Sequence, residues 1–98
     1  MENFLNKYCV VRSTNAGVFF GIVKRINGEI VEMEKTRKLY YWDGAFAVEG
    51  LAQKGVTKPQ NCKFTCFVDN LIINGVNQIL ICSEKSIESL SAVPVWEI

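Results

Sequence analysis

The sequence predicts an α+β domain that is rich in strands and carries two short helices. Its antiparallel sheet is expected to be strongly bent, or to form a small barrel-like meander of the SH3-like or Sm-like type. Short segments rich in β-branched and aromatic residues follow one another with turn signals between them, and Asn27 with Gly28 is the strongest hairpin signal. Two later segments have apolar residues at helical spacing.

Four strands are predicted in the first half of the chain. The second contains Gly21, which indicates a bend or the close approach of another backbone. The third follows the hairpin turn. The four predicted strands are residues 8–13, 18–26, 29–35 and 37–42.

A helix is predicted over residues 45–54, because its apolar residues recur at positions i, i+3 and i+4. Asp43 is well placed to cap the helix N-terminus, since a carboxylate accepts from free backbone N–H groups. Gly55 is expected to end the helix.

The rest of the chain predicts two more strands, residues 61–69 and 76–82, with a short apolar segment between them. Ser83 is expected to cap a final helix over residues 84–92. The apolar tail, residues 95–98, either packs on the core or reaches a partner. Strand alternation places Cys62, Phe64, Cys66 and Val68 on the inner face of the first of these strands.

Length and composition limit the classes of function. The 98 residues predict a single domain, residues 1–98, with a formal net charge of +1. This charge argues against a protein that nucleic acid holds by a broad basic surface. The absence of histidine excludes histidine-dependent catalysis and histidine-ligated metal sites. We therefore expect no catalytic residues, no enzyme activity and no cofactor.

The four cysteines are expected to be free, buried thiols, with no metal bound. Cys62 and Cys66 are close in sequence, but Cys9 and Cys82 are each isolated, whereas a structural zinc site usually needs two close pairs. No apolar stretch is long enough to span a bilayer, and the N-terminus lacks the features of a signal peptide. The sequence therefore predicts a cytoplasmic protein without a membrane partner.

The densest chemistry lies in residues 35–44, where three cations precede three aromatic residues and a helix start. Aromatic faces stack on nucleobases, and cations with free backbone N–H groups hold phosphate. Asp43 carries a negative charge that repels phosphate, so it would accept a hydrogen bond from a ribose hydroxyl or a base amine. The predicted ligand-binding residues are Arg12, Arg37, Lys38, Tyr40, Tyr41, Trp42, Asp43 and Gly44.

Strand alternation divides this segment into two faces, and one face must be core. A site would therefore use only part of these residues. In the competing interpretation, the aromatic residues are core and rim side chains and the cations are solvated. The alternation predicts Lys38, Tyr40 and Trp42 on one face, with Arg37, Leu39 and Tyr41 on the other.

Two other segments carry polar groups. The loop of residues 13–17 has the composition to present N–H groups to phosphate, although an ordinary turn is the favoured interpretation. Lys24 and Arg25 are expected to pair with Glu32 and Glu34 across an exposed sheet face.

Four motifs run through the chain: Val11-Arg12, Ala16-Gly17-Val18-Phe19-x-Gly21, Tyr41-Trp42-Asp43-Gly44-Ala45 and Pro59-x-Asn61-Cys62-Lys63-Phe64. Together they resemble a family of small, uncharacterised bacteriophage proteins, over roughly residues 8–85. The resemblance implies an accessory protein of phage or prophage origin that acts in the bacterial cytoplasm. One class of small phage protein sequesters the nucleotide second messengers of antiviral defence, and the content of residues 35–44 is compatible with that class.

Three functions remain open. The preferred hypothesis is a non-enzymatic binder of a small nucleotide, a homo-oligomer that sequesters a host defence signal. The first alternative is a module that inhibits a host defence enzyme through protein–protein contacts. The second is a single-stranded nucleic-acid binder on a small barrel, against which the near-zero charge counts.

Overall fold

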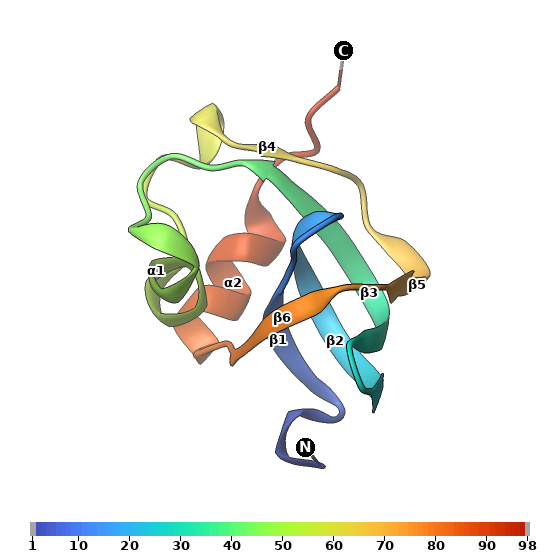
Figure 1. The fold of residues 1–98 in the computed structure, drawn as a ribbon. Helices are drawn as coiled ribbons and strands as arrows, with labels where there is room; N and C mark the ends of the chain where they lie inside the picture. The colour runs from blue at the N-terminus through green and yellow to red at the C-terminus, as the bar shows by residue number, and fades with distance from the viewer. Residues whose placement is uncertain (1, 98) are drawn as a thin grey trace.

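The computed structural model describes residues 2–97 as one bent sheet with two helices on the same side of it (Figure 1). Every strand pairing in this sheet is antiparallel. The elements in chain order are η1 (Glu2–Phe4), β1 (Lys7–Ser13), β2 (Gly17–Asn27), β3 (Ile30–Tyr41), α1 (Ala47–Lys54), η2 (Pro59–Asn61), β4 (Lys63–Phe64), β5 (Val68–Ile73), β6 (Val76–Ile81) and α2 (Glu84–Ala92).

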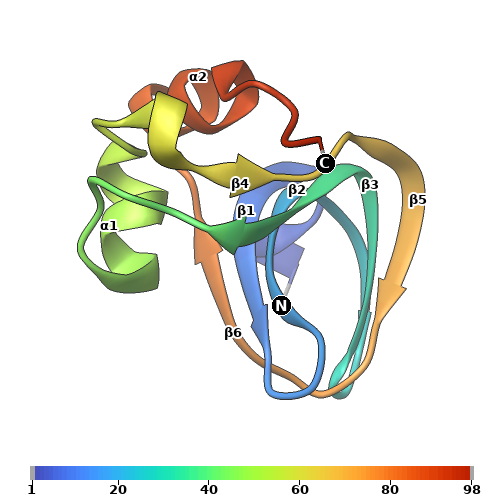
Figure 2. The ribbon, with the colours of Figure 1, turned by 90° about the horizontal axis from the view of Figure 1, so that it is seen from above.

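The sheet has six strands in the order β4-β3-β2-β1-β6, and β5 pairs with the first half of β3. β5 and β6 are consecutive in the chain, yet they pair with different strands and bring the two sides of the bent sheet together at residues 74–75 (Figure 2). This arrangement confirms the predicted β-rich α+β class. Between Val68 and Ile81, β5 and β6 do not pair with each other, so the sheet is not closed and the barrel form is not confirmed.

The central strands are buried on both faces. Val10 and Phe20 point toward the helices and pack in a core with Leu51 and Leu90. Their neighbours along the strands, such as Val11, point into the bend of the sheet and form a second core. This double burial explains why β1 and β2 contain consecutive apolar residues and not a strict alternation.

One long strand, β3, replaces the predicted third and fourth strands. The expected break, at Thr36, directly follows Lys35, which has a φ of 48°, and the β2–β3 register shifts between Phe20 and Ile22. The backbones are very close here, because a Cβ added to Gly21 would lie 2.7 Å from Cα of Thr36. The predicted close approach at Gly21 is therefore confirmed, and the predicted break in the chain is a bulge.

The predicted fifth strand, residues 61–69, is wrong as a continuous element. The chain forms η2 and the two-residue β4, then crosses to the other end of β3 and forms β5. The crossing leaves Cys66 and Val68 exposed, whereas Cys62 and Phe64 are buried as predicted. A local pattern of alternate apolar residues does not reveal such a change of partner position.

The two helix caps differ in outcome. Ser83 caps α2 as predicted, since its Oγ accepts a hydrogen bond from the Ser86 amide at 3.0 Å. Asp43 does not cap α1, because the helix begins later, with Phe46 at the N-cap position and no side-chain cap. The first-turn N–H groups of α1 therefore lack a side-chain acceptor.

Residues 95 and 96 of the predicted tail pack on the sheet, whereas Ile98 lies outside the described residues. Val95 forms a parallel bridge with Phe64, and the Trp96 amide donates to the Phe64 carbonyl at 2.9 Å. The C-terminal segment thus lies beside β4 (Figure 2). Between residues 2 and 97, no helix is long and apolar enough to cross a membrane.

Candidate ligand-binding site

The structure brings only two of the eight predicted site residues, Arg12 and Trp42, together at one hollow. Arg12 lies on β1, opposite Val18 of β2 on one side and Gln78 of β6 on the other. Trp42 follows the end of β3, and the first turn of α1 closes the hollow. Its volume is about 400 Å³, and its lining consists of Arg12, Val18, Trp42, Ala47, Val48, Glu49 and Gln78.

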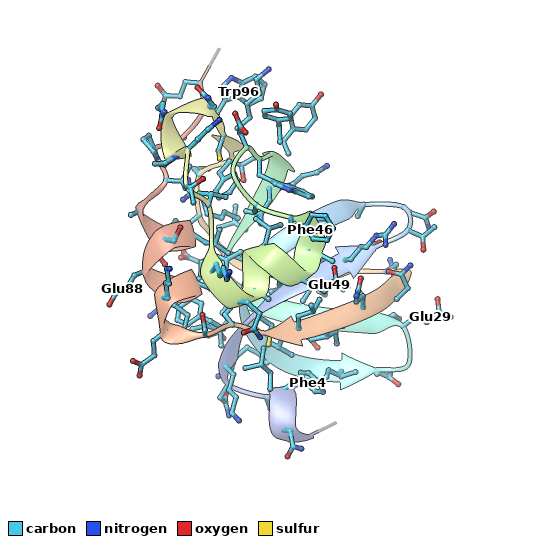
Figure 3. The ribbon with its side chains drawn as sticks, turned by 90° about the vertical axis from the view of Figure 1, so that its left-hand side faces the viewer. Phe4, Glu29, Phe46, Glu49, Glu88 and Trp96 are labelled. Carbon is cyan, nitrogen blue, oxygen red and sulfur yellow. The ribbon has the colours of Figure 1, made fainter. Side chains whose placement is uncertain are left out.

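The hollow combines three kinds of chemistry. Trp42 is half-buried and packs against the helix-side core, which holds its ring in place. Arg12 is exposed and carries the cation. Glu49 extends from α1 beside β6, where its Oε2 accepts a hydrogen bond from Nε2 of Gln78 at 3.2 Å (Figure 3). An aromatic face, a cation and a polar amide–carboxylate pair therefore surround one space.

Arg37 lies in the core, so it is not a solvent-facing phosphate ligand as predicted. Its side chain is 1% exposed. Nε donates to the Thr65 carbonyl at 2.9 Å, and Nη1 donates to the carbonyls of Leu90 and Val93 at 3.1 and 2.9 Å. Burial lowers the pKa of this guanidinium from its ordinary value. The bonds place a cation at the C-terminal end of α2, where the helix dipole favours positive charge.

Two aromatic rings enclose the Arg37 guanidinium. Its central carbon lies 5.3 Å from the ring centre of Phe64 and 4.6 Å from that of Phe67. Nη2 is buried without a hydrogen-bond partner. Through these contacts, Arg37 of β3 connects the segment between β4 and β5 with the C-terminal end of α2. Its role is therefore structural.

Lys38 and the two tyrosines lie elsewhere. The ammonium of Lys38 is 6.0 Å from the ring centre of Phe19, at a separate hollow beside Thr65 and Cys66. Tyr40 and Tyr41 are both exposed, on the surface that carries the C-terminal segment. Tyr41 was predicted on the same face as Arg37 and Leu39, but it is exposed whereas they are buried. The prediction is wrong here because the β3–β4 pairing has an irregularity between Leu39 and Tyr41.

Asp43 and Gly44 shape the connection between β3 and α1. Asp43 Oδ2 accepts a hydrogen bond from the side-chain Nδ2 of Asn61 at 3.0 Å. The backbone N–H of Thr57 donates to the Gly44 carbonyl at 3.1 Å. Gly44 has a φ of 88°, which favours glycine. Neither residue lines the hollow of Arg12 and Trp42.

In the loop of residues 13–17, the backbone N–H groups of residues 14–16 donate hydrogen bonds to other groups of the protein. Ser13 Oγ accepts from the amides of Asn15 and Ala16 at 3.3 and 3.1 Å, and it donates to the Asn74 carbonyl. The Thr14 amide donates to Gly75. These bonds favour the ordinary-turn interpretation over a phosphate loop.

The cysteines and surface charges also have defined positions. All four cysteines are free, and burial raises the pKa of Cys9 to about 12. Among residues 2–97, no three His, Cys, Asp or Glu side chains form a group that could hold a metal ion. Arg25 pairs with Glu32 at 3.2 Å, as predicted, whereas Lys24 donates to the side chain of Asn6.

Sequence reasoning did not find the remaining residues of the hollow. Val18 and Gln78 meet Arg12 only through strand register, which a single sequence does not reveal. Glu49 joins them because α1 begins late and turns its first residues toward β6. Only the pairing of Arg12 with Val18 had a signal in the sequence, because both residues flank the same short turn.

These observations define a small β-rich α+β domain with a surface hollow beside its first helix. The chain belongs to the family described as a domain of unknown function, DUF6948, which matches residues 6–90. This match includes every strand and every residue of the hollow. Comparison with curated proteins gives no match, and comparison with solved structures gives none either.

Proposed function

We propose that the protein is a non-enzymatic binder of a small nucleotide, held in the hollow of Arg12 and Trp42. The observation that carries this proposal is the meeting of these two side chains in a space of about 400 Å³. Ligand pockets usually have volumes of about 300–1,000 Å³. The space is therefore large enough for one nucleotide.

Three of the lining side chains contact the nucleotide in this proposal. The Trp42 ring stacks on the base, and the Arg12 guanidinium contacts phosphate. Glu49 accepts from a base amine or a ribose hydroxyl, the role that the sequence suggested for Asp43. Glu49 also repels a phosphate close to α1, so the phosphate lies on the Arg12 side of the hollow.

The biological part of the proposal follows the resemblance to phage proteins. The protein would act in the bacterial cytoplasm as a phage accessory protein and sequester a nucleotide that signals host defence. It would do so as a homo-oligomer and without turnover.

A second candidate is a module that inhibits a host defence enzyme by protein contact. Phe46 is 89% exposed and Ile72 is 64% exposed, and large exposed apolar side chains favour protein contacts. This candidate predicts a host protein that co-purifies at a stoichiometric amount with the native chain. It also predicts that Phe46→Ser or Ile72→Ser releases that protein.

The proposed hollow is tested with Trp42 as the only tryptophan. In a Trp96→Phe background, AMP, GMP and a cyclic dinucleotide are titrated while the fluorescence of Trp42 is followed. A saturable quench is expected for at least one of them. Arg12→Gln should weaken that binding about tenfold or more, because a hydrogen bond to a charged group contributes about 1.5–3 kcal/mol.

Arg25→Gln is the matched control, since Arg25 is an exposed arginine of β2 that pairs with Glu32 and does not line the hollow. It should leave the affinity unchanged. Native mass spectrometry of protein from a bacterium with active nucleotide signalling should release the same ligand intact. Absence of quenching by all three ligands, or equal affinity in Arg12→Gln, contradicts the proposal.

A further inference from the structure

A second surface of the chain carries an aromatic patch, which consists of Tyr40, Tyr41, Lys63 and Trp96. Tyr40 and Trp96 stack with ring centres 5.6 Å apart and planes only 3° from parallel. The ammonium of Lys63 lies 5.3 Å from the ring centre of Trp96 and 6.0 Å from that of Tyr41. Three separate segments, β3, β4 and the C-terminal segment, supply these side chains.

The backbone holds the patch in place. Tyr41 lies opposite Lys63 in the β3–β4 ladder. The Trp96 amide is bonded to the Phe64 carbonyl, so the C-terminal segment brings its ring to the sheet. The two stacked rings are therefore preorganised, and a ligand would not have to order them.

The rings remain open to solvent. Tyr40 is 61% exposed and Trp96 is 37% exposed. Stacking on Trp96 covers one face of Tyr40, so its large exposed fraction leaves the other face free. The patch is distinct from the hollow, because Trp96 and Glu49 lie at different places on the surface (Figure 3).

We propose that the aromatic patch binds single-stranded nucleic acid by stacking one unpaired base on the free face of Tyr40. Lys63 would contact the phosphate next to that base. Parallel exposed rings beside a cation are the arrangement that binds single strands without sequence preference. A net charge of +1 excludes affinity through many phosphates, so stacking supplies most of this binding.

A single strand fits the patch better than a protein partner. The four side chains are polar at their edges, with two hydroxyl groups and an ammonium. A flat base needs only one open ring face, whereas a protein partner needs a wider apolar surface. The proposal does not depend on the hollow of Arg12 and Trp42.

The test uses Trp42→Phe, which leaves Trp96 as the only tryptophan. A fluorescein-labelled (dA)6 strand is followed by anisotropy, together with quenching of Trp96. Tyr40→Ala should weaken binding about 5- to 150-fold, the range that one base–aromatic stack contributes. Lys63→Gln should weaken it and remove a salt dependence whose log–log slope is about −0.7, the value for one phosphate.

The controls use matched exposed residues. Phe46→Ala removes an aromatic ring outside the patch, and Lys85→Gln removes an exposed cation of α2, so both should bind like the parent. Equal binding of a duplex, or unchanged binding in Tyr40→Ala, overturns the proposal. Equal binding of dAMP overturns the assignment to a strand, and binding only to a co-purifying protein assigns the patch to protein contacts. Circular dichroism confirms folding of each variant.

Discussion

Arg37 shows how one residue can satisfy a sequence pattern and still have a different role. Its neighbours Lys35 and Lys38 are accessible, but its own guanidinium binds carbonyls that lie 28 to 56 positions away in the chain. No local rule connects these positions. The sequence therefore predicted that Arg37 is a phosphate ligand, whereas its guanidinium binds carbonyls at the C-terminal end of α2.

Arg37→Ala is expected to lower the free energy of unfolding by about 3–5 kcal/mol, because it leaves three carbonyls without their donor and opens a cavity between two rings. Urea denaturation followed by circular dichroism measures this change. Arg37→Lys should also destabilise, since an ammonium cannot bond in the planar, forked geometry. Arg25→Ala should change stability by less than about 1 kcal/mol. A similar loss in both alanine variants would refute the structural role of Arg37.

The thiol of Cys9 gives a pH dependence at the same scale. Burial raises its pKa from 9.0 to about 12, so the folded state keeps a proton that the unfolded state releases. The stability linked to this thiol is complete below pH 9 and falls as the pH rises from about 9 to 12, by up to about 1.4 kcal/mol per pH unit. Burial raises the pKa of Cys82 in the same direction.

Urea titrations at pH 8, 9 and 10 test this expectation. Cys9→Ala should make the fall in stability less steep, because alanine has no proton to lose. Cys66→Ala is the matched control, since Cys66 is exposed, and it should leave the slope unchanged. Identical slopes in all three proteins would refute the link between Cys9 and alkaline instability.

At the scale of elements, the close approach of β2 and β3 at the bulge depends on Gly21. A side chain there would meet Oγ1, Cβ and Cα of Thr36 at 2.1, 2.6 and 2.7 Å. Sequence reasoning identified the close approach from a glycine inside an apolar strand. It missed the continuity of β3, because a bulge and a strand end share the same local signals.

Gly21→Ala is expected to destabilise the protein by about 1–3 kcal/mol or to prevent folding, because the added carbon overlaps backbone atoms. Adding Thr36→Ala should not rescue it, since Cβ and Cα remain. Gly50→Ala is the opposite case. Gly50 lies inside α1, and an added Cβ would be 3.5 Å from its nearest neighbour, Cβ of Phe46, so this substitution should stabilise the protein by about 0.5–1 kcal/mol. Thermal unfolding of the three variants provides the comparison, and a stable Gly21→Ala would contradict the close approach of Gly21 and Thr36.

At the scale of the whole molecule, the predicted class and most helices and strands are confirmed, because hydrophobic periodicity and turn residues act locally. The candidate site was less predictable. Arg12 and Trp42 meet, but the hollow also needs Gln78 of β6 and Glu49 of α1. These arrive through strand register and the starting point of a helix, which depend on the complete fold.

The two cores share their central strands, so the protein is expected to unfold as one unit. Val10→Ala in the helix-side core and Val11→Ala in the inner core should each lower the free energy of unfolding by about 1.5–3 kcal/mol. In both variants, tryptophan fluorescence and far-ultraviolet circular dichroism should report coincident urea transitions. Two separated transitions would show that the cores unfold independently.

Double burial of the central strands also limits which substitutions selection can accept. In an ordinary surface sheet, every second position is free to become polar and to accumulate neutral changes. Cys9, Val10 and Val11 offer no such position, because successive side chains enter opposite cores. Related chains should therefore diverge quickly in β5, where Asp69, Asn70 and Ile72 face solvent, while residues 9–11 of β1 change only between apolar residues of similar volume.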